Sequence, residues 1–400
     1  MTHHTTDGAA SRPENHGLFS RARQFFAILG GIYVLVVVLL AIPLIQSHVL
    51  YMNALKLPWG AQFDAPEKYG LAPGKTTNVK ITTADNVTLG AWFVLSDTLY
   101  HELPFPPQSS ATKSHIPVAL RTHPTILFFH GNGATRALST RVRYYSAFSS
   151  RLKANVLAID YRGYGDSEGA PSEVGLATDA RAAWDWLMSY GTKAEDILII
   201  GHSLGTAVAS SLTVNLSDSG VQPKGTVLMS PFSSIYNLVD TYLLFGLFPV
   251  MLPLTLIPRA AQFYKSFLVH EFDTLSAITR MQAPLLIVHA ENDWDIQHAH
   301  SDALFDALLE LYLPPLNSPP LSPGTWSKGD WKAHGEQLKR RKEVRDSLLT
   351  ETNIPNFGSL NELNSGEVRI VLLKTLEGSH NHVGTLEGVQ DVIRNVFSLP

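Results

Sequence analysis

Short runs of apolar residues recur along the chain and predict the strands of a buried sheet. A continuous apolar run of this kind is typical of a strand covered on both faces, as in a parallel sheet. Such runs occupy residues 125–130, 155–160, 197–200, 225–229, 284–289 and 368–374. Small and aliphatic residues at 204–212 predict a helix directly after the third run. The pattern therefore predicts an α/β domain.

A much longer apolar stretch lies near the N-terminus. Residues 25–45 carry no charged side chain. As a helix, this stretch would be long enough to cross roughly 30 Å of hydrocarbon. A cleaved signal peptide is the alternative, but its apolar core is usually about 7–15 residues long and no clear cleavage site follows here. We expect a cytosolic, disordered tail over residues 1–24 and a transmembrane helix over 25–49.

Charges beside this stretch predict its orientation. Three arginines precede the stretch, Arg12, Arg21 and Arg23, and only Lys56 follows it closely. Positive charge beside a membrane span favours the cytosolic side. The remainder of the chain would then be lumenal or extracellular, and we expect the endoplasmic reticulum. Sequons at Asn86 and Asn215 are compatible with that side.

A second apolar segment, residues 242–257, is interrupted by two prolines and is too short for a second span. We expect a cap over about 232–275 that lines an acyl pocket and dips into the bilayer; a packed cap helix is the plainer alternative.

Residues 314–364 form a Pro-rich and charged insertion, which Trp326 and Trp331 are expected to anchor to the domain.

Composition narrows the possible functions. The chain has 400 residues, 45% of them hydrophobic, and a formal net charge of −4, so a large core is possible and nucleic acid is not an expected partner. Its one dense basic run, residues 339–342, is explained by a solvated helix face. The absence of cysteine excludes disulfides and thiolate chemistry.

The third apolar run ends in Gly201-His-Ser-Leu-Gly205, a G-x-S-x-G pattern. In a nucleophile elbow of this kind, a tight strand-to-helix turn exposes the serine hydroxyl, and the helix N-terminus offers free N–H groups. A capping serine at an ordinary corner is the alternative. We interpret Ser203 as a nucleophile.

The first run ends in His130-Gly-Asn-Gly133, which is typical of an oxyanion loop. The backbone N–H groups of Asn132 and Leu204 are the expected donors to the oxyanion. In the alternative interpretation, His130 only holds an ordinary turn.

An activated serine needs a histidine base and an orienting acid. Three acids follow the fifth run: Glu291, Asp293 and Asp295. The spacing Ala290, Asp293, Ile296 matches the hydrolase pattern, so we select Asp293, with Asp295 as runner-up. After the sixth run, His380 follows Gly-Ser and is preferred as base over His382.

Other histidines near the acid have no assigned chemistry. We interpret His298 and His300 as polar helix positions, and the spacing from His289 to His300 fits no metal-binding helix pattern. We expect neither a metal nor an organic cofactor.

Taken together, these motifs resemble the α/β-hydrolases, and specifically the membrane-anchored lipases that act on monoacylglycerol and lysophosphatidylserine. The segments that carry the resemblance are HGNGATR from His130, DYRGYGDSEGAPSE from Asp160, GHSLGTAVA from Gly201, SPF from Ser230 and HAENDWD from His289. Gln297 and Gly133 depart from the usual pattern. The resemblance implies a mostly parallel eight-stranded sheet within residues 50–400, and a structural role for Asp160, Arg162 and Asp166.

The resemblance also implies a function: a membrane serine hydrolase that cleaves one acyl ester of a monoacylglycerol or lysophospholipid through an acyl-enzyme. A protein or acyl-CoA thioesterase would use the same residues. A catalytically inactive binding protein with this fold is the alternative from a different class. Acyl length, head group and oligomeric state are not encoded in any motif.

Overall fold

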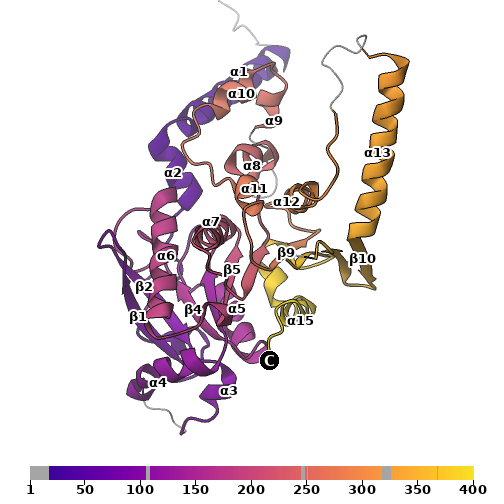
Figure 1. The fold of residues 1–400 in the computed structure, drawn as a ribbon. Helices are drawn as coiled ribbons and strands as arrows, with labels where there is room; N and C mark the ends of the chain where they lie inside the picture. Colours follow the sequence, from indigo (N-terminus) through magenta and orange to yellow (C-terminus); the bar gives the residue numbers. More distant parts are fainter. Residues whose placement is uncertain (1–17, 105–108, 245–247, 250, 318–325, 367) are drawn as a thin grey trace, which may run out of the picture.

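The computed structural model describes residues 18–104, 109–244, 248–249, 251–317, 326–366 and 368–400 (Figure 1). Its main sheet has ten strands in the order β1-β2-β4-β3-β5-β6-β9-β12-β11-β10. The strands are β1 (Thr76–Thr82), β2 (Thr88–Val94), β3 (Thr125–Phe129), β4 (Asn155–Ile159), β5 (Ile197–His202), β6 (Gly225–Met229), β9 (Leu285–Ala290), β10 (Leu349–Ile354), β11 (Gly358–Leu363) and β12 (Ile370–Thr375).

The six strands from β4 to β12 in this order are parallel, and each corresponds to one of the apolar runs. The strands β3 to β6 and β9 are fully buried along their length. Because parallel strands share one carboxyl edge, the segments that follow β3, β5, β9 and β12 gather there.

Helices cover both faces of this sheet (Figure 1). One hydrophobic cluster packs α6 (Glu173–Ser189), α7 (Leu204–Asp218) and α12 (Ala299–Glu310) on one face. A second cluster packs α5 (Ser139–Arg151) and α15 (Glu387–Val396) on the other. The helices α3 (Asp97–Tyr100) and α4 (Ser109–Thr122) lie at the end of the molecule opposite α1.

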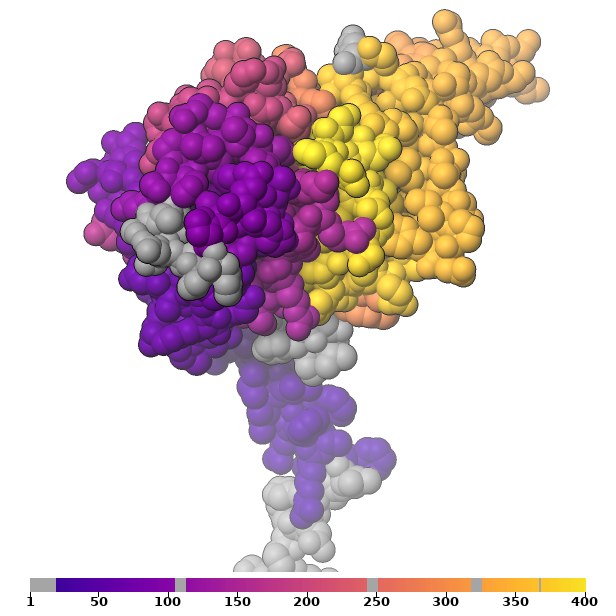
Figure 2. All heavy atoms as spheres, turned by 90° about the horizontal axis from the view of Figure 1, so that it is seen from below, coloured from indigo at the N-terminus to yellow at the C-terminus, as the bar shows by residue number. Residues whose placement is uncertain are grey.

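The N-terminal apolar helix begins earlier and ends earlier than predicted. Helix α1 spans Leu18–Leu40, so residues 18–24 are helical rather than part of a disordered tail, while residues 1–17 lie outside the described part. The helix stops before Pro43, which starts α2 (Pro43–Tyr51), because proline disfavours the helical conformation in the residue before it. By length and composition, the helix Phe19–Leu40 is long and apolar enough to cross a membrane. Figure 2 shows α1 leaving the body as a narrow stalk.

The segment between β6 and β9 forms a cap of short elements at the carboxyl edge of the sheet. These are α8 (Ile235–Thr241), β7 (Leu243–Leu244), β8 (Phe248–Pro249), α9 (Leu252–Thr255), α10 (Ala260–Lys265) and α11 (Thr274–Ile278). Residues 245–247 and 250, and the side chains of 243–249, lie outside the description, so the expected acyl-pocket lining stays a prediction.

The insertion contributes structure that the apolar pattern did not predict. Helix α13 (Lys328–Leu348) buries none of its residues and leads into β10 and β11, which add two polar strands to the expected eight. Trp326 and Trp331 pack edge to face, with ring centroids 4.6 Å apart, and half of Trp331 is exposed. Both rings also contact the ring of His334 in α13, so these contacts lie within the insertion, and anchoring to the domain stays a prediction.

Candidate active site

Ser203 occupies the tight turn between β5 and α7. Its φ of 52° and ψ of −121° are strained for a residue with a side chain. A Cβ at Gly201 would lie 2.2 Å from the carbonyl oxygen of Gly205, and one at Gly205 would lie 2.1 Å from that of Phe129. Both glycines are therefore required by the close approach of α7 to β5 and β3, and the turn holds Ser203 at the carboxyl edge.

The loop after β3 lies against this turn. A Cβ at Gly131 would be 3.1 Å from the Cβ of Ser203, so nothing larger than glycine fits between them comfortably. Leu204 is the first residue of α7 and its N–H has no acceptor within the helix. Within the residues that the structure describes, the N–H of Asn132 also has no acceptor. Both predicted oxyanion donors are therefore free.

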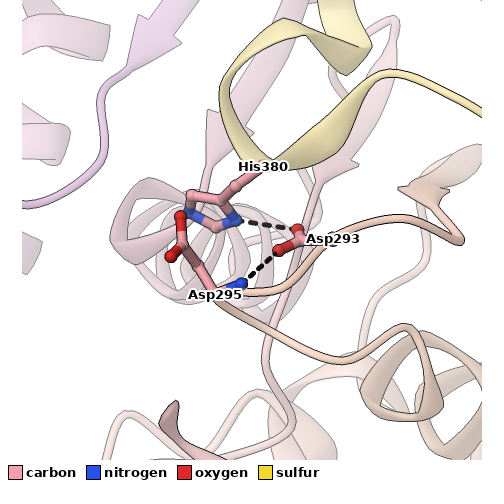
Figure 3. Close-up of side chains that lie close together, drawn as sticks. All are labelled: Asp293, Asp295 and His380. Atoms are coloured by element: carbon pink, nitrogen blue, oxygen red, sulfur yellow. Dashed lines mark hydrogen bonds and ion pairs between the residues drawn. The ribbon is translucent and has the colours of Figure 1, made fainter. Parts of the chain in front are cut away.

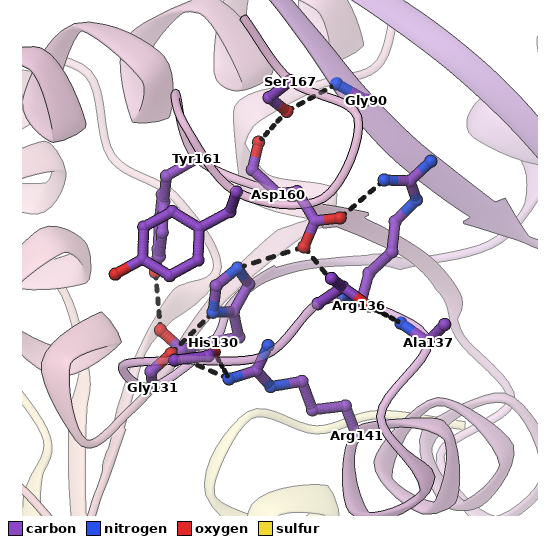
Figure 4. A network of polar contacts seen from close by, with 12 residues as sticks. Gly90, His130, Gly131, Arg136, Ala137, Arg141, Asp160, Tyr161 and Ser167 are labelled. Carbon is purple, nitrogen blue, oxygen red and sulfur yellow. Dashed lines mark hydrogen bonds and ion pairs between the residues drawn. The ribbon is translucent and has the colours of Figure 1, made fainter. Parts of the chain in front are cut away.

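Arg141, on α5, holds the carbonyl side of the same loop (Figure 4). Its Nη2 donates to the carbonyl oxygens of Gly131 at 2.9 Å, Asn132 at 3.2 Å and Gly133 at 2.7 Å. In a trans peptide the C=O and the next N–H point in opposite directions. Turning the Gly131 carbonyl toward Arg141 therefore turns the Asn132 N–H away from it. No motif in the sequence indicated this role for a helical arginine.

A buried network of charged residues packs against the loop that follows β3. Asp160 accepts from the backbone N–H and the Nη1 of Arg136 at 2.7 and 2.6 Å, and the Nε2 of His130 lies 3.3 Å from it. Burial lowers the pKa of His130 to about 4, and the nearby positive charge of Arg141 adds to this effect. Burial opposes ionisation of Asp160, but Arg136 and His130 outweigh it and lower its pKa. Arg136 also pairs with Asp166 at 2.7 Å.

Arg162 forms ion pairs with two other carboxylates. Its guanidinium contacts Asp85 at 2.7 Å and Asp179 at 2.8 Å, and its side chain is almost fully buried. Its charge is thus taken up inside the protein, in agreement with the structural role expected for this segment.

Asp293 lies in the loop after β9 and is 5% exposed. Its Oδ1 accepts from the backbone N–H groups of Asp295 and Ile296, at 3.0 and 2.9 Å. Its Oδ2 lies 2.8 Å from Nδ1 of His380 and 3.2 Å from Nε2 of His289. Burial alone would raise the pKa of Asp293, but the hydrogen bonds from His289 and His380 outweigh it and hold the pKa well below its usual range.

His380 lies in α14 (Ser379–His382), in the loop after β12. The side chain of Asn292 accepts from the backbone N–H of Ser379 at 2.8 Å, so the loops of the acid and the histidine are joined. His382 is exposed, and its Nδ1 lies 3.5 Å from the hydroxyl of Ser379. Of the two candidate bases, His380 is the one that contacts Asp293.

His202 connects this loop to the elbow. Its Nε2 lies 2.7 Å from the carbonyl oxygen of His380, to which it can donate only as the Nε2–H form. Burial, together with the charge of His380, lowers the pKa of His202 to about 3, so the ring is neutral at physiological pH. The Ser203 hydroxyl itself has no hydrogen-bond partner in the described part of the chain. In unliganded serine hydrolases the hydrogen bond between nucleophile and base is often long, and it tightens when substrate binds.

Two histidines play roles that periodicity did not reveal. His289 is fully buried and, besides Asp293, contacts the Ser301 hydroxyl at 2.6 Å and the Ile296 carbonyl at 2.9 Å. His300 is 6% exposed and bonds Ser233 and Thr241 of the cap segment, at 3.0 and 2.9 Å. The interpretation of His300 as a simple polar helix position was wrong, because it ties α12 to the cap.

Asp295, the runner-up acid, is partly exposed and lies on the other side of His380. One ligand atom from each of Asp293, Asp295 and His380 falls within 4.8 Å of the others, a spacing that could also hold a metal ion. Figure 3 shows Asp293 at one edge of the imidazole and the carboxylate of Asp295 beside the opposite edge. The hydrogen bond to Nδ1 distinguishes Asp293 as the acid that can orient the ring.

Known proteins match both the fold and the sequence. A model of the alpha/beta hydrolase family matches residues 126–347. The lysophosphatidylserine lipase ABHD12 of Xenopus tropicalis is 32% identical over 70% of this chain and 69% of its own length. The protein of that name from Danio rerio is 30% identical over 72% and 73%, and the human protein ABHD12B is 29% identical over 68% and 71%.

Among solved structures, an alpha-beta hydrolase from Vibrio vulnificus is similar with a TM-score of 0.53 and 16% identity, over 88% of this chain and 92% of that one. This likeness concerns the fold alone. The predicted fold class and family resemblance are thus confirmed. The chain therefore belongs to the α/β-hydrolase family, as a serine ester hydrolase related to the lysophosphatidylserine lipases.

Proposed function

We propose that the chain is a membrane-anchored hydrolase that cleaves the carboxylic ester of a single-chain lipid at Ser203. The observation that carries the proposal is the attachment of the cap beside this site to the apolar N-terminal helices. Gln46, on α2, donates to the carbonyl oxygen of Phe267 at 2.8 Å and accepts from the N–H of Val269 at 3.1 Å. A catalytic edge held at a membrane anchor suits a substrate that resides in the bilayer.

The proposed reaction assigns one step to each residue. Ser203 attacks the ester carbonyl while Nε2 of His380 accepts the hydroxyl proton and then delivers it to the leaving alcohol. Asp293 orients the imidazole through Nδ1 and stabilises its charged form. The N–H groups of Asn132 and Leu204 stabilise the oxyanion, each by roughly 3 kcal/mol in the transition state. Water then hydrolyses the acyl-enzyme with the same histidine as base.

The outer surface of the cap supports contact with lipid. Helix α10 lies along α1, where the Tyr264 hydroxyl donates to the Leu40 carbonyl at 3.3 Å (Figure 1). Large apolar side chains of α9, α10 and their flanks are exposed beside α1: Leu252, Leu256, Ile257, Phe263 and Phe267. Of these, Leu256 is 78% and Phe263 69% exposed, which is costly in water and favourable in a bilayer. The apolar surface of α1 thus continues onto the cap.

For the substrate class we propose a lysophospholipid or a monoacylglycerol. The curated relatives are named lysophosphatidylserine lipases, which supports a single acyl chain with a polar head. We further propose that the catalytic domain faces the lumen of the endoplasmic reticulum. The excess of arginine at the N-terminal end of the apolar stretch, with Arg21 and Arg23 in the first turns of α1, supports this orientation.

A panel of esters tests the function. The purified full chain in detergent micelles should hydrolyse oleoyl monoacylglycerol and oleoyl lysophospholipids, whereas the matched Ser203→Ala protein should not. Diacylglycerol and oleoyl-CoA complete the panel. Turnover of the thioester alone, or of no ester at all, would overturn the proposal.

Topology is tested separately in sealed microsomes. We expect the catalytic domain to resist added protease until detergent is present. Asn86 lies exposed in the turn between β1 and β2, so a glycan there should disappear in Asn86→Gln. Digestion of the domain without detergent would place it in the cytosol.

A further inference from the structure

Asp295 places a second carboxylate at the proposed catalytic histidine. Its oxygen lies within 4.8 Å of the ligand atoms of His380 and Asp293, beside the ring edge that Asp293 does not occupy (Figure 3). The backbone N–H of Asp295 donates to Oδ1 of Asp293 at 3.0 Å, which holds the main chain of the two residues together. Among the described residues, the Asp295 side chain has neither an ion pair nor a hydrogen bond.

The negative charge of Asp295 also reaches the cap. Burial raises the pKa of Tyr242, at the end of α8, and the charge of Asp295 raises it further. Asp295 is therefore a partly exposed carboxylate beside the imidazole, without an ion pair among the described residues. A charge kept in such a place without a partner inside the protein remains available to a bound molecule.

The chemistry of ester cleavage decides which part of the substrate meets this carboxylate. Nε2 of His380 must come within hydrogen-bond distance of the leaving oxygen in order to protonate it. A carboxylate beside that ring edge then faces groups a few bonds beyond the leaving oxygen. In a monoacylglycerol these groups are free hydroxyls, which can donate to Asp295. In a lysophospholipid the same region carries an anionic phosphate.

We propose that Asp295 determines leaving-group specificity, favouring an uncharged polyol such as glycerol over one that carries phosphate near the ester. This inference rests on the proposed function and narrows its substrate class. For two unit charges roughly 6 Å apart at an effective dielectric constant of about 20, repulsion corresponds to a factor of about one hundred. Salt and water reduce this, so about tenfold discrimination is expected.

The test compares two esters with one acyl chain, 1-oleoylglycerol and 1-oleoyl lysophosphatidic acid, in the same mixed micelles with full-length protein. Asp295→Asn should shift the ratio of their kcat/KM values by about tenfold toward the phosphate substrate. The matched control is Glu291→Gln, which removes an exposed acid from the same loop. Equal labelling of all three proteins by a fluorophosphonate would show that each retains its folded site.

An unchanged ratio in Asp295→Asn, or the same shift in Glu291→Gln, would overturn the inference. So would a loss of several thousandfold on both esters, which would make Asp295 the orienting acid. If the wild-type protein hydrolysed neither ester, the proposed function itself would fail, and this result is distinct from an unchanged ratio.

Discussion

The imidazole of His202 lies 2.7 Å from the backbone carbonyl of His380, a residue 178 positions away in the sequence. His202 directly precedes Ser203 in the elbow, so this contact fixes the histidine-bearing loop relative to the serine. The two rings lie 5.1 Å apart. Because burial keeps His202 neutral at physiological pH, it supports the loop without adding a charge beside His380.

We expect Asp293→Asn to lower kcat far more than Asp295→Asn. Only Asp293 contacts Nδ1 of His380, and loss of such an acid costs about 10⁴-fold in the serine-protease template. Steady-state hydrolysis of a soluble short-chain ester measures both variants on one substrate without micelle effects. The reverse ranking would assign the orienting role to Asp295.

We expect Arg141→Met to lower kcat by about tenfold to a hundredfold, with a smaller change in KM. The variant keeps the apolar volume but removes the donors that orient the oxyanion loop, and so misdirects the Asn132 N–H. Arg141→Lys, which keeps a charge and a donor, should recover part of the rate. A reduced melting temperature with unchanged kcat would instead assign Arg141 a purely structural role.

The apolar face of the cap predicts a defect that depends on chain length. Replacing Leu256 and Phe263 with serine should lower turnover of an oleoyl ester by about tenfold, since apolar contact with the bilayer is lost. A short water-soluble ester should be unaffected. Val118→Ser is the matched control, because Val118 is an exposed apolar residue on α4, at the far end from α1. Equal losses on both esters would indicate a packing role for the cap.

The buried histidines predict instability in acid. Burial lowers the pKa of His130 and His300 to about 4 and that of His202 to about 3, whereas an unfolded histidine titrates near pH ~6.5. The unfolded chain therefore takes up these protons first as pH falls. The contribution of these histidines to the free energy of unfolding should not change with pH above pH ~6.5. It should fall below that pH by up to about 1.4 kcal/mol per pH unit for each histidine, until its folded pKa is reached.

Urea unfolding of the micelle-bound protein between pH ~7.5 and pH ~5 measures this slope, because these values lie above and below the unfolded pKa of about 6.5. His300→Asn keeps a polar side chain between Ser233 and Thr241 and should reduce the slope by about one proton. A slope that does not change in this variant would contradict the assignment of His300 as a buried neutral group.

The sequence predicted the parts of this molecule that depend on local pattern. Continuous apolar runs identified the central strands, and Gly201 and Gly205 identified the elbow, because the close approach of helix and strand requires glycine there. The choice of Asp293 and His380 followed from their order after successive strands, and the structure brings these two side chains into contact.

Other features depend on contacts between distant segments and left no local signal. Arg141 reads as an ordinary helical arginine until α5 packs beneath the oxyanion loop. Strands β10 and β11 are mostly polar, so no apolar run marked them. The N-terminal helix was misplaced at both ends because hydrophobicity alone ignored the helical residues from Leu18 and the break before Pro43.

The most direct test of the account is identification of the residue that a fluorophosphonate modifies, combined with hydrolysis of a lipid ester by the same preparation. Ser203 should carry the adduct in the wild-type chain. Ser203→Ala should lose both labelling and hydrolysis while keeping the wild-type melting temperature, since the lost hydroxyl makes no hydrogen bond within the described residues and alanine keeps the Cβ of the turn. An adduct on another residue, or hydrolysis by Ser203→Ala at near the wild-type rate, would contradict the account.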